Sequence, residues 1–303
     1  MLHLTKLREL TLIAPSDPRR PAYISAGSGL VVVGQHLYVV ADDELFLGHF
    51  DLNSDAPGEL LRVFPGELPD KKKPRKKYKP DFELLLRLAA FAQYPHGALL
   101  AMGSGSTERR YRAVLLSLGA HGEVSGALQL LDATALYELL AKQFAELNLE
   151  GGWVQGNELR LLQRGNKGDS PNAVIHLPLQ PLLNALSSDR LPAVKPLAIN
   201  RMKLGHIDNI PLCFSDGCAL NDGRWLFTAV AEDTDSAYED GACAGAAVGM
   251  VDADDQLMWI KRVTPSYKIE GIEVQSQADG IHVLLASDAD DINVPSSLLS
   301  ATL

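Results

Sequence analysis

The chain has 303 residues, which is enough to bury a large core, and its 28 Lys and Arg against 38 Asp and Glu give a formal net charge of −10. This balance favours the attraction of cations and disfavours non-specific binding to nucleic acid, so we expect no nucleic-acid partner. Residues 1–10 are charged where a signal peptide would be apolar, and no stretch is long and apolar enough to cross a membrane. We therefore expect a cytoplasmic protein that does not contact a membrane.

The first strands expected from the sequence are short and joined by turns. Residues 7–12 alternate weakly and predict an isolated strand, which Pro15 and Pro18 end. Four more short strands are expected at residues 28–33, 36–40, 45–50 and 60–64. Four short antiparallel strands in succession are the pattern of one blade of a β-propeller.

A basic segment interrupts this pattern. Most of residues 71–79 are Lys or Arg, within a Pro-rich stretch that we interpret as a loop insertion at 65–80. Like charges in a run repel one another and usually stay solvated, which favours a plain surface loop. The alternatives are side chains that fold as a lid over an acidic or phosphorylated ligand, and a nucleic-acid contact.

Residues 81–118 predict the start of a second blade. Residues 84–91 have a helical composition, but the strands expected at 97–102 and 111–118 favour a strand there as well. Asp132 then precedes a run of helix formers with apolar residues near helical spacing, which predicts a helical insertion at 132–146.

One pattern recurs in the second half of the chain. An acidic residue followed by glycine starts a strand, a tight turn follows, and a second apolar strand ends in polar residues. The pattern occurs at Glu150-Gly151, Asp216-Gly217 and Glu270-Gly271. Repetition on this scale is typical of repeat folds. Successive blades then start at Ser28, Asp81, Glu150, Asp216 and Glu270. The sequence thus predicts about five blades, or six if an insertion hides another.

The N-terminal strand and the C-terminal blade are expected to pair with each other. The last blade, residues 268–303, has only three expected strands, while the strand at 7–12 has no partner. If residues 7–12 pair into the C-terminal blade, the ring closes and leaves no open edge. The predicted fold is all-β: a single β-propeller domain over residues 1–303.

The predicted fold also places a site. In a propeller, the starts of the first strands and the loops between second and third strands share one face, so their residues converge on the mouth of the central channel. The first set is Ser28, Asp81 or Glu83, Glu150, Asp216 and Glu270. The second set is Asp42, Asp43, Ser104, Ser106, Arg164, Asn166, Glu232, Asp233, Asp288, Asp290 and Asp291.

Several carboxylates around one channel mouth repel unless positive charge compensates them. A hard cation would do so, and oxygen ligands without a His and Cys cluster favour Ca²⁺ over zinc. The candidate metal ligands are Glu150, Asp216, Glu270 and Asp81. Two alternatives stay open: the acids accept hydrogen bonds from backbone amides and pair with Lys79, Arg164 or Lys268, or they act directly in acid–base chemistry.

Cations beside acids would suit a small anionic ligand, such as a phosphate ester bridged to the metal. The candidate ligand-binding residues are Arg164, Asn166, Lys268, Lys79, Glu232, Asp233, Asp288 and Asp290. Two functions follow. The first is a metal-dependent hydrolase of a phosphate ester or lactone, with its site at the channel mouth. The alternative is a non-catalytic propeller that binds a ligand or a protein there and whose repeated acids are structural.

Other chemistries have weaker support in the sequence. Cys213, Cys218 and Cys243 match no zinc spacing, which favours small buried side chains. The segment Ser104-Gly105-Ser106 lacks the Gly-x-Ser-x-Gly pattern of a nucleophile elbow.

Six short segments carry a family likeness: residues 79–83, 149–151, 163–166, 231–234, 268–272 and 287–291. Together they resemble an uncharacterised family of bacterial β-propeller proteins. The resemblance covers most of the chain and implies the propeller fold without an established activity. More remotely, the Glu-Gly start of a strand and the acid after the next strand resemble the phytase-like, esterase-like and calcium-dependent lactonase propellers. That likeness implies a metal-dependent hydrolase with calcium in the channel.

Overall fold

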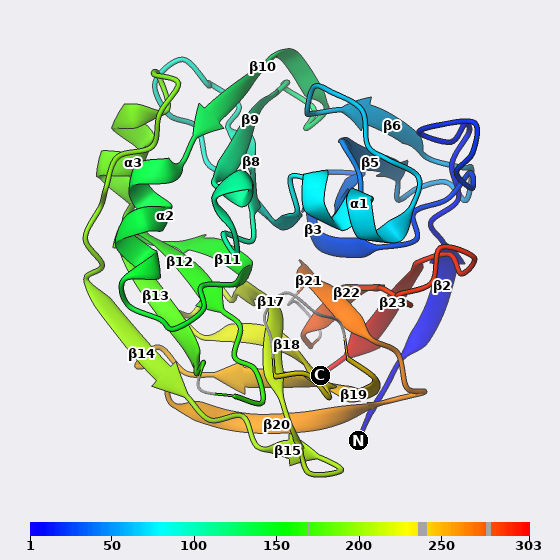
Figure 1. Ribbon diagram of the computed structural model, residues 1–303, viewed down its shortest axis with the longest axis vertical. Helices are drawn as coiled ribbons and strands as arrows, with labels where there is room; N and C mark the ends of the chain where they lie inside the picture. Colours follow the sequence, from blue (N-terminus) through cyan, green and yellow to red (C-terminus); the bar gives the residue numbers. More distant parts are fainter. Residues whose placement is uncertain (169, 236–240, 277–279) are drawn as a thin grey trace.

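The computed structural model describes residues 1–168, 170–235, 241–276 and 280–303. Five antiparallel sheets stand in a ring around a central axis, each with its first strand innermost (Figure 1). The prediction of an all-β propeller is confirmed, with five blades and not six.

The strands of the five blades follow one another in chain order. Blade 1 contains β3 (Gly27–Val33), β4 (His36–Ala41), β5 (Phe46–Asp51) and β6 (Glu59–Arg62). Blade 2 contains β7 (Phe82–Leu88), β8 (Ala98–Gly103), β9 (Arg112–Leu118) and β10 (Val124–Asp132). Blade 3 contains β11 (Leu149–Gln155), β12 (Glu158–Gln163), β13 (Asn172–Pro178) and β14 (Ala198–Met202). Blade 4 contains β17 (Cys213–Ala219), β18 (Trp225–Glu232), β19 (Cys243–Val251) and β20 (Leu257–Thr264). Blade 5 contains β21 (Ile269–Ser276), β22 (His282–Ser287), β23 (Ser297–Thr302) and the N-terminal β2 (Thr5–Glu9).

The N-terminal segment closes the ring, as predicted. Strand β2 pairs antiparallel with β23, with Thr5 opposite Ser300. It begins and ends earlier than the expected strand at 7–12, because Leu10 and Leu12 are buried in the core between blades 5 and 1. A second contact was not predicted: β1 (Leu2–His3) pairs parallel with β20 of blade 4. The first nine residues thus join two neighbouring blades.

The apolar core is divided among the junctions between blades. Each of five clusters of buried residues draws on two neighbouring blades. At the junction of blades 3 and 4, for example, the rings of Trp153 and Trp225 lie 4.9 Å apart between centroids. Burial between sheets, rather than within one sheet, therefore holds the ring together.

The segments outside the blades differ in part from the predictions. The basic stretch at 65–80 contains the short helix α1 (Lys72–Tyr78), which lies beside the central channel in Figure 1. Helix α2 (Thr134–Ala141) lies within the expected helical insertion, and α3 (Leu179–Ala185) follows β13. A 3₁₀ turn, η1 (Glu108–Arg110), and a small hairpin of β15 (His206–Ile207) and β16 (Ile210–Pro211) complete the elements.

Two outer strands also differ from the expected boundaries. Strand β10 has no counterpart in the predicted elements, because Ser125, Gly126 and Gln129 break its apolar pattern. The fourth strand of blade 3 begins at Ala198, after Pro196, although a strand at 193–199 was expected. None of the helices in the described part of the chain has the length and apolar content needed to cross a membrane.

Candidate functional site

The first strand of every blade has an irregular register near its start. The pairing with the second strand skips Glu83, Glu150, Ser215 and Glu270, and in blade 1 it skips Ser28 together with Gly29. A β-bulge of this kind re-aims a side chain, and bulges are common next to functional sites. We call Ser28, Glu83, Glu150, Ser215 and Glu270 the bulge ring.

The Glu-Gly repeat has a packing origin beside the bulge ring. A Cβ added to Gly271 would lie 2.4 Å from the Ser28 carbonyl oxygen, and one added to Gly151 would lie 2.7 Å from the Asp216 Cα. Neighbouring first strands approach so closely at the axis that these positions exclude a side chain. The glycine therefore marks inter-blade contact, while the preceding glutamate belongs to the ring.

Asp216 does not occupy the position that the repeat suggested. The register aligns Ser215, not Asp216, with Glu150 and Glu270. Asp216 is buried next to the bulge, and its Oδ2 accepts a hydrogen bond of 3.0 Å from the Ile272 amide of blade 5. Its carboxyl is thus part of the contact between blades 4 and 5 and does not line the cavity at the channel mouth.

A polar cavity of about 400 Å³ opens at this mouth, and we call it the mouth cavity. Both signs of charge line it. Its acids are Asp42, Asp43, Asp70, Asp81, Glu83, Glu150, Glu232, Glu270, Asp288, Asp290 and Asp291. Its cations are Arg20, Lys72, Arg75, Lys76, Lys79, Arg110, Arg164 and Lys268.

Lys268 joins acids from blades 4 and 5 on one side of the mouth cavity. Its Nζ lies 2.8 Å from Glu232 Oε1, 3.1 Å from Glu270 Oε1 and 2.9 Å from Asp290 Oδ1. Its side chain is 11% exposed. The ammonium therefore compensates several carboxylates that would otherwise repel one another.

Arg164 has the same role between blades 3 and 4. Its guanidinium lies 2.7 Å from Glu232 Oε2 and 3.4 Å from Glu150 Oε1. Asn148 also donates a hydrogen bond of 2.5 Å to Glu150 Oε1. Glu150 is thus held by a charged and a neutral donor.

Asp81 anchors the opposite side of the mouth cavity. It pairs with Lys79 at 2.8 Å and with Arg110 at 2.7 Å, and it accepts a hydrogen bond from Ser104. Although burial opposes the charged form, Lys79 and Arg110 hold the pKa of Asp81 below its ordinary value. Lys79 also pairs with Asp42, at the end of β4.

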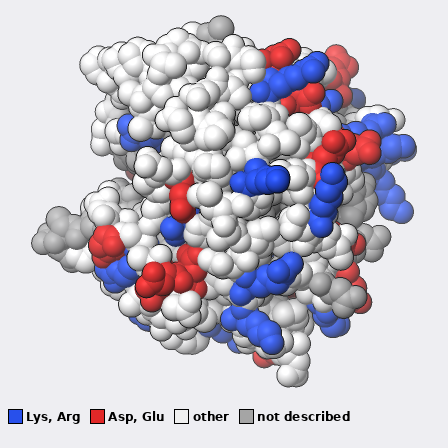
Figure 2. Space-filling view, turned by 90° about the vertical axis from the view of Figure 1, so that its left-hand side faces the viewer, with Lys and Arg blue, Asp and Glu red and all other residues white. Residues whose placement is uncertain are grey.

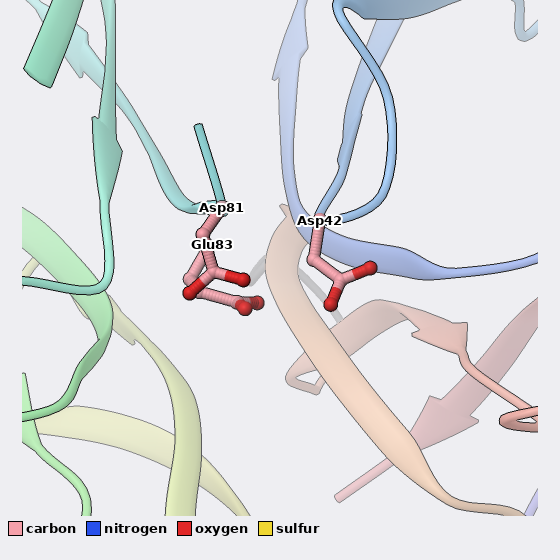
Figure 3. Close-up of side chains that lie close together, drawn as sticks. All are labelled: Asp42, Asp81 and Glu83. Atoms are coloured by element: carbon pink, nitrogen blue, oxygen red, sulfur yellow. The ribbon is translucent and has the colours of Figure 1, made fainter. Parts of the chain in front are cut away.

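One group of acids in the described residues has the proximity that a metal ion requires. Oxygen atoms of Asp42, Asp81 and Glu83 lie within 4.8 Å of one another. Figure 3 shows the three carboxyl groups directed into the same space, Asp42 from blade 1 and the other two from the start of β7. The Lys79 ammonium contacts Asp42 and Asp81 and so already supplies positive charge there.

The carboxyls of the bulge ring have perturbed pKa values. Burial, together with the charges of Glu150, Asp81 and Asp42, raises the pKa of Glu83 well above its ordinary value. Burial raises the pKa of Glu150 to about 8, although Arg164 opposes the shift. Burial also raises the pKa of Glu270, against Lys268 and Arg164. Burial near the axis thus favours the protonated form of these carboxyls, and the neighbouring cations oppose it.

The structure brings together most, but not all, of the residues selected from the sequence. Among the predicted metal ligands, Glu150, Glu270 and Asp81 line the mouth cavity and Asp216 does not. The predicted ligand-binding residues that line it are Arg164, Lys268, Lys79, Glu232, Asp288 and Asp290. Asn166 instead donates to Glu146, and Asp233 pairs with Lys167 at 2.7 Å on the surface.

Three lining residues had no recognisable signal in the sequence: Arg20 near the N-terminus, Arg110 in a turn after β8, and Asn148 just before β11. Arg75 and Lys79 also line the cavity, and the basic run before blade 2 was the signal for both. Elsewhere, acidic and basic residues are interspersed on the side shown in Figure 2, with broad uncharged areas between them.

Comparisons with known proteins identify a family and similar folds, and they assign no activity to the chain. A family described as a family of unknown function, DUF6929, matches residues 23–303. No curated protein matches the chain. The match to DUF6929 supports a propeller family without an assigned activity, whereas the likeness to phytase-like, esterase-like and lactonase propellers stays a prediction.

Solved structures similar to the chain share little sequence identity with it. An α-L-arabinofuranosidase from Podospora anserina, in complex with cellotriose, has a TM-score of 0.51 and 11% identity, over 100% of this chain and 97% of its own. A β-fructofuranosidase from Bombyx mori, in complex with sucrose, has a TM-score of 0.50 and 8% identity, over 92% of this chain and 60% of its own. A luciferin-regenerating enzyme has a TM-score of 0.43 and 10% identity, over 93% and 92%.

Proposed function

The chain belongs to the DUF6929 family of unknown function, and we propose that it is a hydrolase whose small polar substrate binds in the mouth cavity. The observation that carries the proposal is the carboxyl pair Glu83 and Glu150. Both belong to the bulge ring, on the first strands of neighbouring blades, and both line the cavity. Their pKa values are raised, and that of Glu83 is raised by Glu150 itself.

The two carboxyls have different surroundings, which suits them to different roles. Arg164 and Asn148 both contact Glu150 Oε1, and these donors favour its charged form. Glu150 therefore ionises first and serves as the general base, which takes a proton from water. Glu83 retains its proton and serves as the general acid, which protonates the oxygen of the leaving group. Pairs of carboxyls whose environments separate their pKa values work in this way in known hydrolases.

The cavity lining indicates the kind of substrate. Charged donors and acceptors dominate it, and no aromatic residue is among the described residues that form it. A substrate with several oxygen atoms would satisfy such a surface. The two solved structures with TM-scores of 0.50 and 0.51 are glycosidases, so glycosides are the first class to test. Phosphate esters and lactones are the next classes.

The proposal is tested with chromogenic glycosides, chromogenic phosphate esters and lactones. We expect one class to be hydrolysed by the wild-type protein. Glu83→Gln and Glu150→Gln should each lower kcat by about 100-fold or more, the usual contribution of a general acid or base. Glu138→Gln, on the exposed side of α2, is the matched control and should keep full activity. The absence of turnover in all three classes would refute the hydrolase, as would full activity in both variants.

A metal-dependent form of the same reaction is the second candidate. It rests on Asp42, Asp81 and Glu83, whose oxygens lie within 4.8 Å of one another. Carboxylate oxygens suit Ca²⁺, and binding would require the Lys79 ammonium to leave Asp42 and Asp81. Metal analysis of the purified protein, with turnover measured before and after chelation and again with added Ca²⁺, decides this candidate. Full turnover in metal-free protein would contradict it.

A further inference from the structure

Two histidines face each other in blade 1, at the end of the sheet away from the mouth cavity. His36 begins β4 and His49 lies on β5, and His36 Nδ1 is 2.8 Å from His49 Nε2. Strand β4 leads from His36 to the residue before Asp42, which lines the mouth cavity, so about 20 Å of strand separates the two places. The histidine pair is therefore distinct from the site already described.

Packing fixes the orientation of both imidazole rings. The His49 ring stacks on the Tyr38 ring at 5.0 Å between centroids, and the His36 ring stacks on it at 6.1 Å. Tyr38 is fully buried, and its hydroxyl donates a hydrogen bond of 3.0 Å to the Gly122 carbonyl oxygen of blade 2. The same hydroxyl accepts one of 2.9 Å from the Val124 amide. The rings are thus held in advance on a rigid part of the sheet.

Glu59 determines which nitrogen of His49 carries a proton. Its Oε1 lies 3.0 Å from His49 Nδ1, and an ionised carboxylate only accepts hydrogen bonds, so the proton is on Nδ1. The lone pair of the neutral ring is then on Nε2, the atom that faces His36. Histidines that bind metal ions commonly have this arrangement, in which a carboxylate holds the nitrogen that does not bind the ion.

The gap between the two rings is close to the size that a metal ion needs. At 2.8 Å a proton lies between the two nitrogens, and His36 Nδ1 donates it. Two histidine nitrogens bound to one tetrahedral Zn²⁺ lie about 3.3 Å apart, so the rings need to separate by only about 0.5 Å. An ion in place of this proton would leave His36 with its proton on Nε2 and would bind both facing nitrogens.

The surrounding charges favour a cation at this place. Asp51 lies directly opposite His36 in the pairing of β4 with β5, on the same face of the sheet as the histidine. Backbone hydrogen bonds and the nearby His121 and His36 hold the pKa of Glu123 below its ordinary value, which places a further acid near the pair. With Glu59, three acids lie around the two rings, in a chain of net charge −10.

We propose that His36 Nδ1 and His49 Nε2 bind a divalent transition-metal ion of the zinc and copper class, with water in the remaining positions. Imidazole nitrogen is a preferred ligand of these ions, whereas Ca²⁺ prefers oxygen. Glu59 is a positioning residue of this site. The proposal goes beyond the hydrolase and does not depend on it, since none of these three residues lines the mouth cavity.

The test is calorimetric titration of Zn²⁺, Cu²⁺ and Ca²⁺ into the full chain without a polyhistidine tag. We expect saturable Zn²⁺ binding, tighter Cu²⁺ binding and no displacement of Zn²⁺ by Ca²⁺. Glu59→Ala should weaken Zn²⁺ binding about tenfold through the lost orientation of His49, and His49→Ala should weaken it further. His36→Gln, which keeps a polar group beside His49, should do the same. His96→Ala removes an exposed histidine of blade 2 and is the matched control, with wild-type affinity.

The outcomes separate this site from the mouth cavity. Glu83→Gln should bind Zn²⁺ as wild type does. The absence of saturable Zn²⁺ binding to the wild-type protein would overturn the site, as would equal affinity in His36→Gln and His96→Ala, both with a normal urea transition. Loss of binding in Glu83→Gln alone would also overturn it, because the ion would then lie in the mouth cavity. Zn²⁺ binding at the histidines without turnover of any substrate would refute only the hydrolase.

Discussion

Replacement of Arg164 by Leu tests whether the protein's own cations balance the acids of the mouth cavity. The Arg164 side chain is 13% exposed and lies 2.7 Å from Glu232 and 3.4 Å from Glu150. Removal of one partner of a buried ion pair leaves an uncompensated charge and typically costs about 3–5 kcal/mol. We expect a loss of this size in the free energy of unfolding at pH 8.

The same replacement should cost less in acid, since Glu150 can then carry a proton. The pKa of Glu150 is raised by burial to about 8 in the folded state, against an ordinary 4.5. A carboxyl whose pKa is higher in the folded than in the unfolded state contributes stability below its unfolded pKa, and this stability is lost as pH rises through its folded pKa. Arg164 limits this loss, so its removal should make stability fall more steeply with pH. We expect a cost of less than about 2 kcal/mol at pH 5.

Urea denaturation of wild type and variant at pH 5 and pH 8 gives these values. Lys167→Leu is the matched control, because Lys167 pairs with Asp233 at the same distance of 2.7 Å but on the surface, with side chains 46% and 49% exposed. It should cost less than about 1 kcal/mol at either pH. Equal costs for the two variants, or a cost for Arg164→Leu that does not grow with pH, would refute internal charge compensation.

Three further predictions concern the ring itself. Gly271→Ala should lower the free energy of unfolding by about 2–3 kcal/mol, because its Cβ would lie 2.4 Å from the Ser28 carbonyl oxygen; an unchanged urea midpoint would contradict the close approach. Deletion of residues 1–9 removes β2 and uncovers the edge of β23, so it should lower Tm and promote aggregation. Calorimetry and light scattering measure the two effects, and an unchanged Tm would argue against ring closure by these residues. The Asp255 carboxylate lies 2.7 Å from His176 and raises the pKa of that imidazole, so this ion pair stabilises the fold below about pH 6.5 and the stabilisation is lost as pH rises through the folded pKa. His176→Gln should make the free energy of unfolding decline less over this range. An identical pH profile of stability in the variant would contradict the role of the ion pair.

The sequence predicted the ring of blades because its signals are local and repeated. Turns, short apolar strands and the Glu-Gly pattern recur at each blade, and they placed Glu150 and Glu270 correctly at the channel mouth. The same pattern misplaced Asp216. A β-bulge changes by one residue which side chains point toward the channel. In blade 4 the bulge lies at Ser215, one residue before the acid, and the sequence does not show this difference.

The basic segment shows a second limit of sequence patterns. Its composition favours a solvated loop, since like charges repel. In the fold, Arg75 and Lys79 meet acids from blade 1 and blade 2, and these contacts hold a helix that has no apolar face of its own. Partners that lie more than 30 residues away, such as Asp43, cannot be inferred from local composition.

The central claim is that Glu150 and Glu83 act as base and acid in the mouth cavity, and the pH dependence of kcat/KM on a hydrolysed substrate tests it most directly. Because burial raises the pKa of Glu150 to about 8, the wild-type value should rise with pH through this range as the base ionises. It should then fall at higher pH as Glu83 loses its proton. Glu150→Gln should retain only residual activity without the rising limb. A wild-type profile that is flat from pH 6 to 10, or a rising limb unchanged in Glu150→Gln, would contradict the assignment.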